Sequence, residues 1–196
     1  MKILKYIIAV FVVFSPPLFA DDDPDVFLKN SVKEISAFIS ENKEALDSDE
    51  NFLRLKVDEL VIPKLDIELM SKIVLGKKNW TSMSASQKKR FQLAFRGLMV
   101  NTYMKSLTSF DGEKIKFLPY EKGKRNDVAR VKSVYLLNEG ELHVSYSLKM
   151  NQSDGWKVYD INIDGISLLR NYRSDFRSHI ERKGMDSLIE ELESKG

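Results

Sequence analysis

The sequence predicts an α+β fold in which helices pack on a bent, four-stranded antiparallel sheet. Helical patterns fill about residues 21–112, strand patterns follow over about 113–165, and helical patterns return over about 166–194. Because the predicted strands are consecutive and joined by short connections, we expect a meander with helices on its apolar face. A bent sheet that is covered by helices encloses a cone-shaped space, and such a space can remain hollow.

The first two helices are predicted from their ends and from apolar spacing. Pro24 suits the first turn of a helix, and Asp22 or Asp23 can cap that turn. A second helix is expected over about 49–61, because the proline at position 63 stops it. Apolar residues of the first helix recur at helical spacing, namely Leu28, Val32, Ile35 and Ile39.

Two further helices have clear boundary signals. A short helix over about 66–75 is expected to end at Gly76, since glycine favours the position after a helix. Ser84 and Gln87 have the spacing of a capping box, which predicts the start of a long helix. The apolar face of that helix is formed by Phe91, Phe95, Leu98, Met99, Thr102, Tyr103 and Leu107.

Four strands are expected, over residues 114–121, 128–137, 141–150 and 155–164. In the third, apolar residues at even positions alternate with polar residues, which predicts one apolar and one polar face. In the fourth, the apolar residues change from even to odd positions, and this shift predicts a bulge or a strong bend. Two helices with apolar faces then finish the chain.

The first twenty residues have the pattern of a secretory signal peptide. Lys2 and Lys5 precede an apolar run over residues 6–14, and Ala20 is a small residue that suits cleavage. A signal anchor is the alternative, but the run is short for a membrane span. We therefore expect residues 1–20 to be removed and residues 21–196 to be exported as a single domain.

Charge and composition exclude several classes of function. The chain has 31 Lys and Arg against 29 Asp and Glu, and the predicted signal peptide holds two of the lysines, so the exported part is formally neutral. Neutrality argues against a nucleic-acid partner. With no cysteine and with only His143 and His179, neither a disulfide nor a zinc site is expected. No nucleophile elbow or phosphate-binding glycine loop occurs, and we predict no catalytic residue and no cofactor.

Three stretches of the chain carry a resemblance to a known family. The first covers residues 66–76 and is followed by Trp80, and the second places Ser84, Gln87, Phe91 and Phe95 at fixed intervals before Thr102-Tyr103. The third contains Trp156-Lys157-Val158-Tyr159-Asp160, then Asp164-Gly165-Ile166-Ser167-Leu168, then Asn171-Tyr172-Arg173 and Phe176. Their order and spacing resemble the MlaC family, also called the toluene-tolerance family. The chain departs from the family pattern at Leu65-Asp66, where an aromatic residue usually precedes the aspartate, and at Ser71-Lys72, which stand near the usual alanine.

The resemblance implies a periplasmic phospholipid carrier without enzymatic activity. Members of the family combine a nuclear transport factor 2-like cone with a helical subdomain, and they hold acyl chains in an apolar cavity with the head group near solvent. The implied partners are phospholipid, the substrate-binding subunit of an inner-membrane ABC transporter, and an outer-membrane complex of a lipoprotein with a porin. The implied role is the maintenance of lipid asymmetry in the outer membrane.

Candidate cavity residues come from both halves of the predicted fold. From the helices before the sheet they are Ile73, Val74, Phe91, Phe95, Leu98, Met99 and Tyr103. From the sheet they are Val134, Leu136, Val144, Tyr146, Leu148, Val158, Ile161 and Ile163, and from the following helix Leu168, Leu169 and Tyr172. Ordinary core packing is the alternative for each of them. Arg173 can either hold a lipid phosphate or form a structural salt bridge with Asp160 or Asp164.

Two other functions remain open at the level of the sequence. A cone-fold enzyme of the isomerase or dehydratase type would use Asp160 or Asp164 as a general acid or base. A periplasmic adaptor without a ligand would instead have a filled core.

Overall fold

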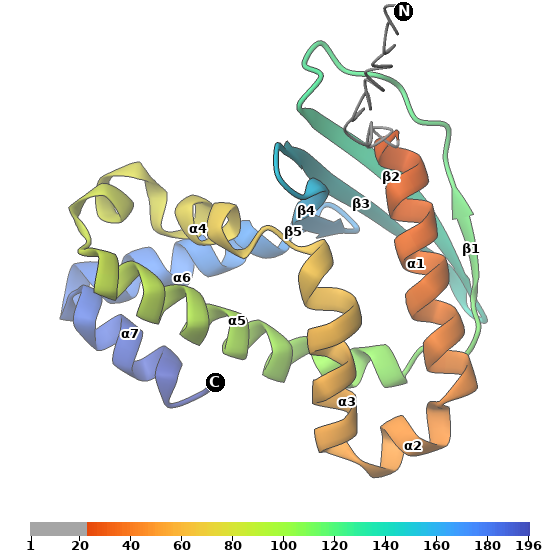
Figure 1. Ribbon diagram of the computed structural model, residues 1–196, viewed down its shortest axis with the longest axis horizontal. Coiled ribbons are helices and arrows are strands. Elements are labelled where there is room, and N and C mark those ends of the chain that lie inside the picture. Colours follow the sequence, from red (N-terminus) through yellow and green to blue (C-terminus); the bar gives the residue numbers. More distant parts are fainter. Residues whose placement is uncertain (1–22) are drawn as a thin grey trace, which may run out of the picture.

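A computed structural model describes residues 23–196 and shows two groups of elements (Figure 1). Helices α4 to α7 form a bundle on one side, and the sheet lies on the other side together with α1 to α3. The signal peptide predicted over residues 1–20 lies outside the described residues. None of the helices in the described part of the chain is both long enough and apolar enough to cross a membrane.

The N-terminal helices form a compact reversal of the chain. Helix α1 (Pro24–Glu41) and helix α3 (Glu50–Lys56) run in opposite directions and are joined by α2 (Lys43–Ser48), a helix that was not predicted from the sequence (Figure 1). The carboxylate of Asp49 caps α3 by accepting hydrogen bonds from the backbone N–H groups of Asn51 and Phe52. After α3 the chain widens into a π-helical turn (Val57–Val61) and a 3₁₀ turn (Ile62–Lys64), so the helix predicted over 49–61 is not regular.

Helix α5 (Ala85–Thr108) begins where the sequence predicts, whereas α4 (Ile67–Ser82) continues beyond the predicted end at residue 75. Helix α4 is broken at Gly76, whose φ of 73° and ψ of 160° are not helical, so its first segment ends where the sequence predicts. The capping box of α5 is confirmed: the Ser84 hydroxyl accepts from the N–H of Gln87, and the Gln87 side chain accepts from the N–H of Ser84.

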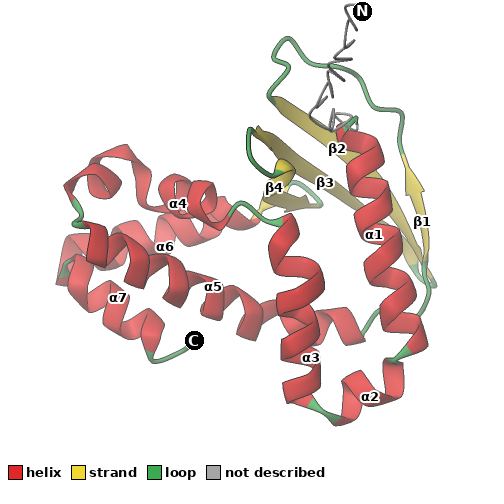
Figure 2. Ribbon diagram, viewed as in Figure 1, coloured by secondary structure: helices red, strands yellow, loops and turns green. Residues whose placement is uncertain are grey.

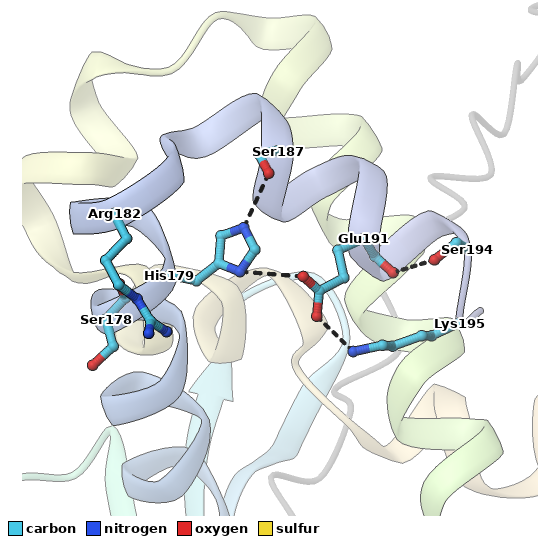
Figure 3. Close-up of polar contacts among 7 residues, drawn as sticks. All are labelled: Ser178, His179, Arg182, Ser187, Glu191, Ser194 and Lys195. Atoms are coloured by element: carbon cyan, nitrogen blue, oxygen red, sulfur yellow. Dashed lines mark hydrogen bonds and ion pairs between the residues drawn. The ribbon is translucent and has the colours of Figure 1, made fainter.

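Helices α6 (Leu168–Lys183) and α7 (Met185–Glu193) complete the bundle. The core between α4, α5, α6 and α7 is closed and includes four aromatic rings whose centroids lie 5.4–5.8 Å apart in contacting pairs, those of Phe91, Phe95, Tyr172 and Phe176. His179 of α6 joins this helix to α7, since its Nε2 lies 3.2 Å from Ser187 Oγ and its Nδ1 lies 3.3 Å from a Glu191 oxygen (Figure 3).

The sheet is an antiparallel meander of β1 (Lys114–Phe117), β2 (Val128–Leu137), β3 (Gly140–Asn151), β4 (Gly155–Ile163) and β5 (Ile166–Ser167), in that order. The predicted count of four is therefore corrected to five. The strand β5 has two residues, which is too short for alternation to reveal. The predicted irregularity of the fourth strand is confirmed, because Ser147 pairs with Asp160 while Leu148 pairs with Val158, leaving one residue of β4 bulged.

The α+β class and the helix-covered sheet are thus confirmed, with two points that matter for the site. One face of the sheet is covered by α1, with Leu28 of that helix packed among Val131, Leu148 and Trp156. The free edge of β4 is partly covered by the chain before α4, where the N–H of Asp66 donates to the carbonyl of Val158. Helix α5 extends from the bundle to the region beside α3, so it belongs to both groups of elements (Figure 2).

Candidate functional site

An apolar hollow lies between the sheet, α1, the π-helical turn after α3, and the C-terminal half of α5. It consists of two adjoining compartments, with cavity volumes of about 170 Å³ and about 380 Å³. We call the smaller one the inner compartment, because six of its fourteen lining residues are buried, whereas only three of sixteen are buried in the larger one, the outer compartment. Both are lined by Val61, Tyr103, Leu107, Ile161 and Leu168.

The inner compartment is lined almost entirely by hydrocarbon and thioether groups. Its remaining lining residues are Val57, Ile62, Leu65, Met70, Met99, Val100, Met104, Val158 and Asp160. Methionine side chains adapt to irregular apolar shapes, so this wall suits a flexible hydrocarbon ligand. The π-helical turn supplies Val57 and Val61 to the wall, and π turns of this kind often occur at functional sites.

The carboxylate of Asp160 is the charged group in the wall of the inner compartment, and both of its oxygens are engaged. One oxygen accepts a hydrogen bond of 2.7 Å from the hydroxyl of Ser167, and the other accepts from the backbone N–H of Leu169 at 3.2 Å. These bonds connect β4 to the beginning of α6. Asp160 therefore fixes the position of a helix start, a role that needs no substrate.

The outer compartment has a more mixed lining. Helix α1 contributes Val32, Ile35, Ser36 and Ile39, helix α5 and the residues after it contribute Ser106 and Phe110, and the sheet contributes Tyr135, Leu142, Val144, Tyr146 and Ile163. Tyr103, Ser106 and Ile163 are exposed to solvent, which places the opening of the compartment beside them. No lysine or arginine belongs to the lining of either compartment in the described structure.

Two tyrosines of the outer compartment are hydrogen-bonded to each other. The hydroxyl oxygens of Tyr135 on β2 and Tyr146 on β3 are 2.9 Å apart. Burial raises the pKa of both phenols above the ordinary tyrosine value, so both remain protonated at neutral pH. Ser133 lies on the same face of β2, and its hydroxyl is buried and has no hydrogen-bond partner among the described residues.

The structure brings eight of the predicted cavity residues together around the two compartments. They are Met99, Tyr103, Val144, Tyr146, Val158, Ile161, Ile163 and Leu168. They come from α5, β3, β4 and the first residue of α6, so the combination of helix and sheet walls is as the sequence suggested.

The other ten predicted residues lie away from both compartments. Seven belong to the closed core of the bundle or pack against it: Ile73, Val74, Phe91, Phe95, Leu98, Leu169 and Tyr172. Leu148 is fully buried in the closed part of the sheet core. Val134 and Leu136 alternate with Tyr135 along β2 and therefore point to the opposite face of the sheet.

Arg173 also lies outside the compartments. It is exposed on α6, and its guanidinium lies beside Gly76, at 3.6 Å from the position that a Cβ atom on this glycine would occupy. The ion pairs found among the described residues do not include one between Arg173 and Asp160 or Asp164. Within residues 23–196, His, Asp and Glu side chains do not converge in a group of three that could hold a metal ion.

The lining contributed by α1, by the π-helical turn and by the end of α5 was not predicted from the sequence, and neither were Tyr135 and Leu142 of the sheet. The apolar spacing of Val32, Ile35 and Ile39 was visible, but spacing alone does not say whether such a face meets a filled core or a hollow. The π-helical turn has no comparable signal, because Val57 and Val61 read as positions of an ordinary helix.

Comparisons with known proteins agree with this architecture. The family model described as MlaC protein matches residues 29–194. The intermembrane phospholipid transport system binding protein MlaC of Haemophilus influenzae is 25% identical over 194 residues, which cover 97% of this chain and 90% of that protein. The toluene tolerance protein ttg2D of Pseudomonas putida is 25% identical over 170 residues, covering 85% of this chain and 77% of that one.

A solved structure shares the fold. The phospholipid-binding protein of Ralstonia solanacearum, solved in complex with a phospholipid, superimposes with a TM-score of 0.80 at 24% sequence identity. The match covers 88% of this chain and 96% of the other. Because the family model extends over residues 29–194, which is most of the chain, this protein belongs to the MlaC family.

Proposed function

We propose that this protein is a phospholipid carrier that acts without catalysis and moves lipid between the inner and outer membranes. Residues 21–196 would act as a single lipid-binding domain. The observation that carries the proposal is the pair of adjoining apolar compartments beneath the sheet, in a chain whose family relatives are named for phospholipid transport and binding. An acyl chain that enters this hollow replaces water against hydrocarbon on nearly every side.

The energetics of such a carrier are close to balance. Transfer of about 30 acyl methylenes out of water contributes about 24 kcal/mol, at about 0.8 kcal/mol for each methylene. A bilayer offers nearly the same gain, so the carrier and the membrane compete on similar terms. Small differences in docking or in the donor machinery then decide the direction of transfer, and a partner can supply the energy.

An enzymatic function finds little support in the geometry of the site. The carboxylate oxygens of Asp160 are occupied by Ser167 and Leu169, and the side chain of Asp164 accepts from the backbone N–H of His143 in an exposed turn. Neither carboxylate is poised as a general acid or base inside the hollow. These bonds favour a structural role for both residues.

The location and the partners belong to the same proposal. The signal-peptide pattern and the family relationship support a periplasmic protein that helps to maintain outer-membrane lipid asymmetry. The proposed partners are the substrate-binding subunit of an inner-membrane ABC transporter, which exchanges lipid with the carrier, and an outer-membrane complex of a lipoprotein with a porin.

The first test is native mass spectrometry of residues 21–196 prepared without detergent, with the bound lipid identified after extraction. We expect a mass that exceeds the polypeptide mass by that of phospholipid in stoichiometric amount. Protein stripped of lipid should regain it from phospholipid vesicles. An unliganded mass together with no uptake from the vesicles would refute the proposal and favour a ligand-free adaptor.

A further inference from the structure

Two phenol hydroxyls lie on the sheet wall of the outer compartment, and a buried serine hydroxyl lies on the same face of the sheet. Tyr135 and Tyr146 line the compartment and share a hydrogen bond of 2.9 Å. Ser133 precedes Tyr135 by two residues and so faces the same side of β2, where it pairs with Val144, the neighbour of Tyr146 on that face of β3. The three hydroxyls therefore form a small polar area on this face of the sheet, and the two phenols present it to the compartment.

One phenol hydrogen in this area has no acceptor among the described residues. Two phenols carry two hydroxyl hydrogens, and their mutual bond uses one of them. The other phenol hydrogen has no acceptor among the hydrogen bonds of the described residues. The fully buried hydroxyl of Ser133 forms no hydrogen bond of regular geometry, but it acts on the Tyr146 phenol and partly offsets the rise in the pKa of that group. Buried polar groups are costly to leave without a partner, so this wall favours a ligand that brings an acceptor.

The charge of the surroundings indicates what kind of acceptor fits. Neither compartment is lined by lysine or arginine, so an anionic phosphate would be buried there without a counter-charge. A neutral carbonyl oxygen has no such requirement. In a diacyl phospholipid the neutral acceptors at the junction of head group and chains are the ester carbonyls.

The distribution of polar groups indicates how the lipid would be oriented. Ser36, Ser106, Tyr135 and Tyr146 place hydroxyls in the outer compartment, and Ser106 lies at its opening. In the inner compartment the carboxylate of Asp160 is already fully bonded, and the rest of the wall is almost wholly apolar. Chains in the inner compartment and ester groups in the outer one match both walls.

We propose that the Tyr135–Tyr146 pair donates a hydrogen bond to an ester carbonyl of a bound diacyl phospholipid and so positions the glycerol end of the lipid. This inference rests on the proposed function, since it needs a phospholipid in the hollow. It assigns to the pair a selectivity for ester-linked chains over ether-linked chains, because an ether oxygen lacks the carbonyl. One hydrogen bond of ordinary strength corresponds to a preference of about fivefold.

The test is a cycle between protein hydroxyls and lipid carbonyls. The lipid-free protein is offered vesicles containing equal amounts of diacyl and dialkyl phosphatidylethanolamine with chains of the same length, and the bound ratio is read by native mass spectrometry. Wild type should take the ester lipid about fivefold over the ether lipid. The double variant Tyr135→Phe/Tyr146→Phe should bring the ratio close to one by losing affinity for the ester lipid alone.

Tyr159→Phe is the matched control, because Tyr159 packs against the helical bundle and lines neither compartment. It should keep the wild-type ratio. A ratio of one in wild type overturns the inference without any variant, and so does an unchanged preference in the folded double variant, while the proposed function stands in both cases. Failure of wild type to bind either lipid overturns the proposed function as well.

Discussion

Val144 and Leu148 occupy the same strand and the same face, yet an arginine should have opposite consequences at the two positions. Val144 lines the outer compartment, whereas Leu148 is fully buried in the closed part of the sheet core. We expect Val144→Arg to fold and to lose lipid binding. We expect Leu148→Arg to fail to accumulate as a folded protein.

The magnitudes follow from where the guanidinium can go. At position 148 it is trapped without a partner, which costs several kcal/mol, and the burial of a leucine side chain, about 2 kcal/mol, is also lost. Together these approach the total stability of about 5–15 kcal/mol that a natural domain has. At position 144 the aliphatic stem lies on the cavity wall and the charge reaches the opening, so the unliganded protein loses only about 1 kcal/mol.

The lipid complex of Val144→Arg is destabilised more than the unliganded protein, because acyl chains would surround the charge. A penalty of about 4 kcal/mol corresponds to about a thousandfold loss of affinity. Circular dichroism should show a cooperative melt near that of wild type, and native mass spectrometry should show no bound lipid.

Ser145→Arg, on the opposite face of β3, is the control and should melt and bind lipid like wild type. Normal lipid loading of a folded Val144→Arg would refute the placement of the cavity, and a folded, unloaded Leu148→Arg would show that the hollow extends to that residue.

Three further outcomes are expected from the bundle. Phe95→Ala removes a fully buried ring that contacts three other aromatic rings. It should lower the free energy of unfolding by about 3–5 kcal/mol and the melting temperature by about 10 °C, while lipid loading stays stoichiometric. Gly76→Ala places a Cβ at a backbone conformation almost confined to glycine, so thermal melts should show a loss of about 1–3 kcal/mol in the free energy of unfolding. Backbone strain alone is the cause, because the nearest atom, on Arg173, is 3.6 Å from the new Cβ. The control Gly123→Ala, where the added Cβ lies in open space, should change the stability little. Hydrogen bonds from Arg90 hold the pKa of Glu193 below its ordinary value, so the stabilisation from this pair is fully present at pH 7 and declines as the pH falls below about 4.5. The melting temperature of Glu193→Gln should therefore fall less than that of wild type between pH 7 and pH 4. Equal decreases in the two proteins would contradict this.

The long helix α5 shows how far the sequence could lead. Its start was predictable because a capping box depends only on neighbouring residues. Its apolar face was also predictable, but the N-terminal half of that face, with Phe91 and Phe95, meets the bundle, whereas Met99 and Tyr103 meet the hollow. The spacing of the residues is the same in both halves. Which half faces a filled space depends on α6 and α7, which lie more than sixty residues further along the chain.

The sheet illustrates the same limit. Alternation in β3 placed Val144 and Tyr146 on the apolar face, because apolar and polar residues there separate clearly. In β2 the apolar run from residue 134 to 137 offers no such separation, and Val134 and Leu136 lie opposite the cavity side. A cavity depends on how side chains from several distant segments pack against each other, and the residue pattern within one segment does not contain this information.

The division of the molecule into a filled bundle and an unfilled hollow has a consequence for protein engineering. Phe91, Phe95 and Phe176 hold the chain together without touching the compartments, while Ile161 and Val144 line the compartments. Met70 and Met99 are shared, because they belong to the bundle core and also line the inner compartment. Substitutions elsewhere in the lining leave the aromatic core of the bundle intact, and stabilising changes around these phenylalanines leave the hollow as it was. A combinatorial library restricted to the compartment lining should consequently yield many folded members, from which binders of sterols, carotenoids or synthetic amphiphiles can be selected.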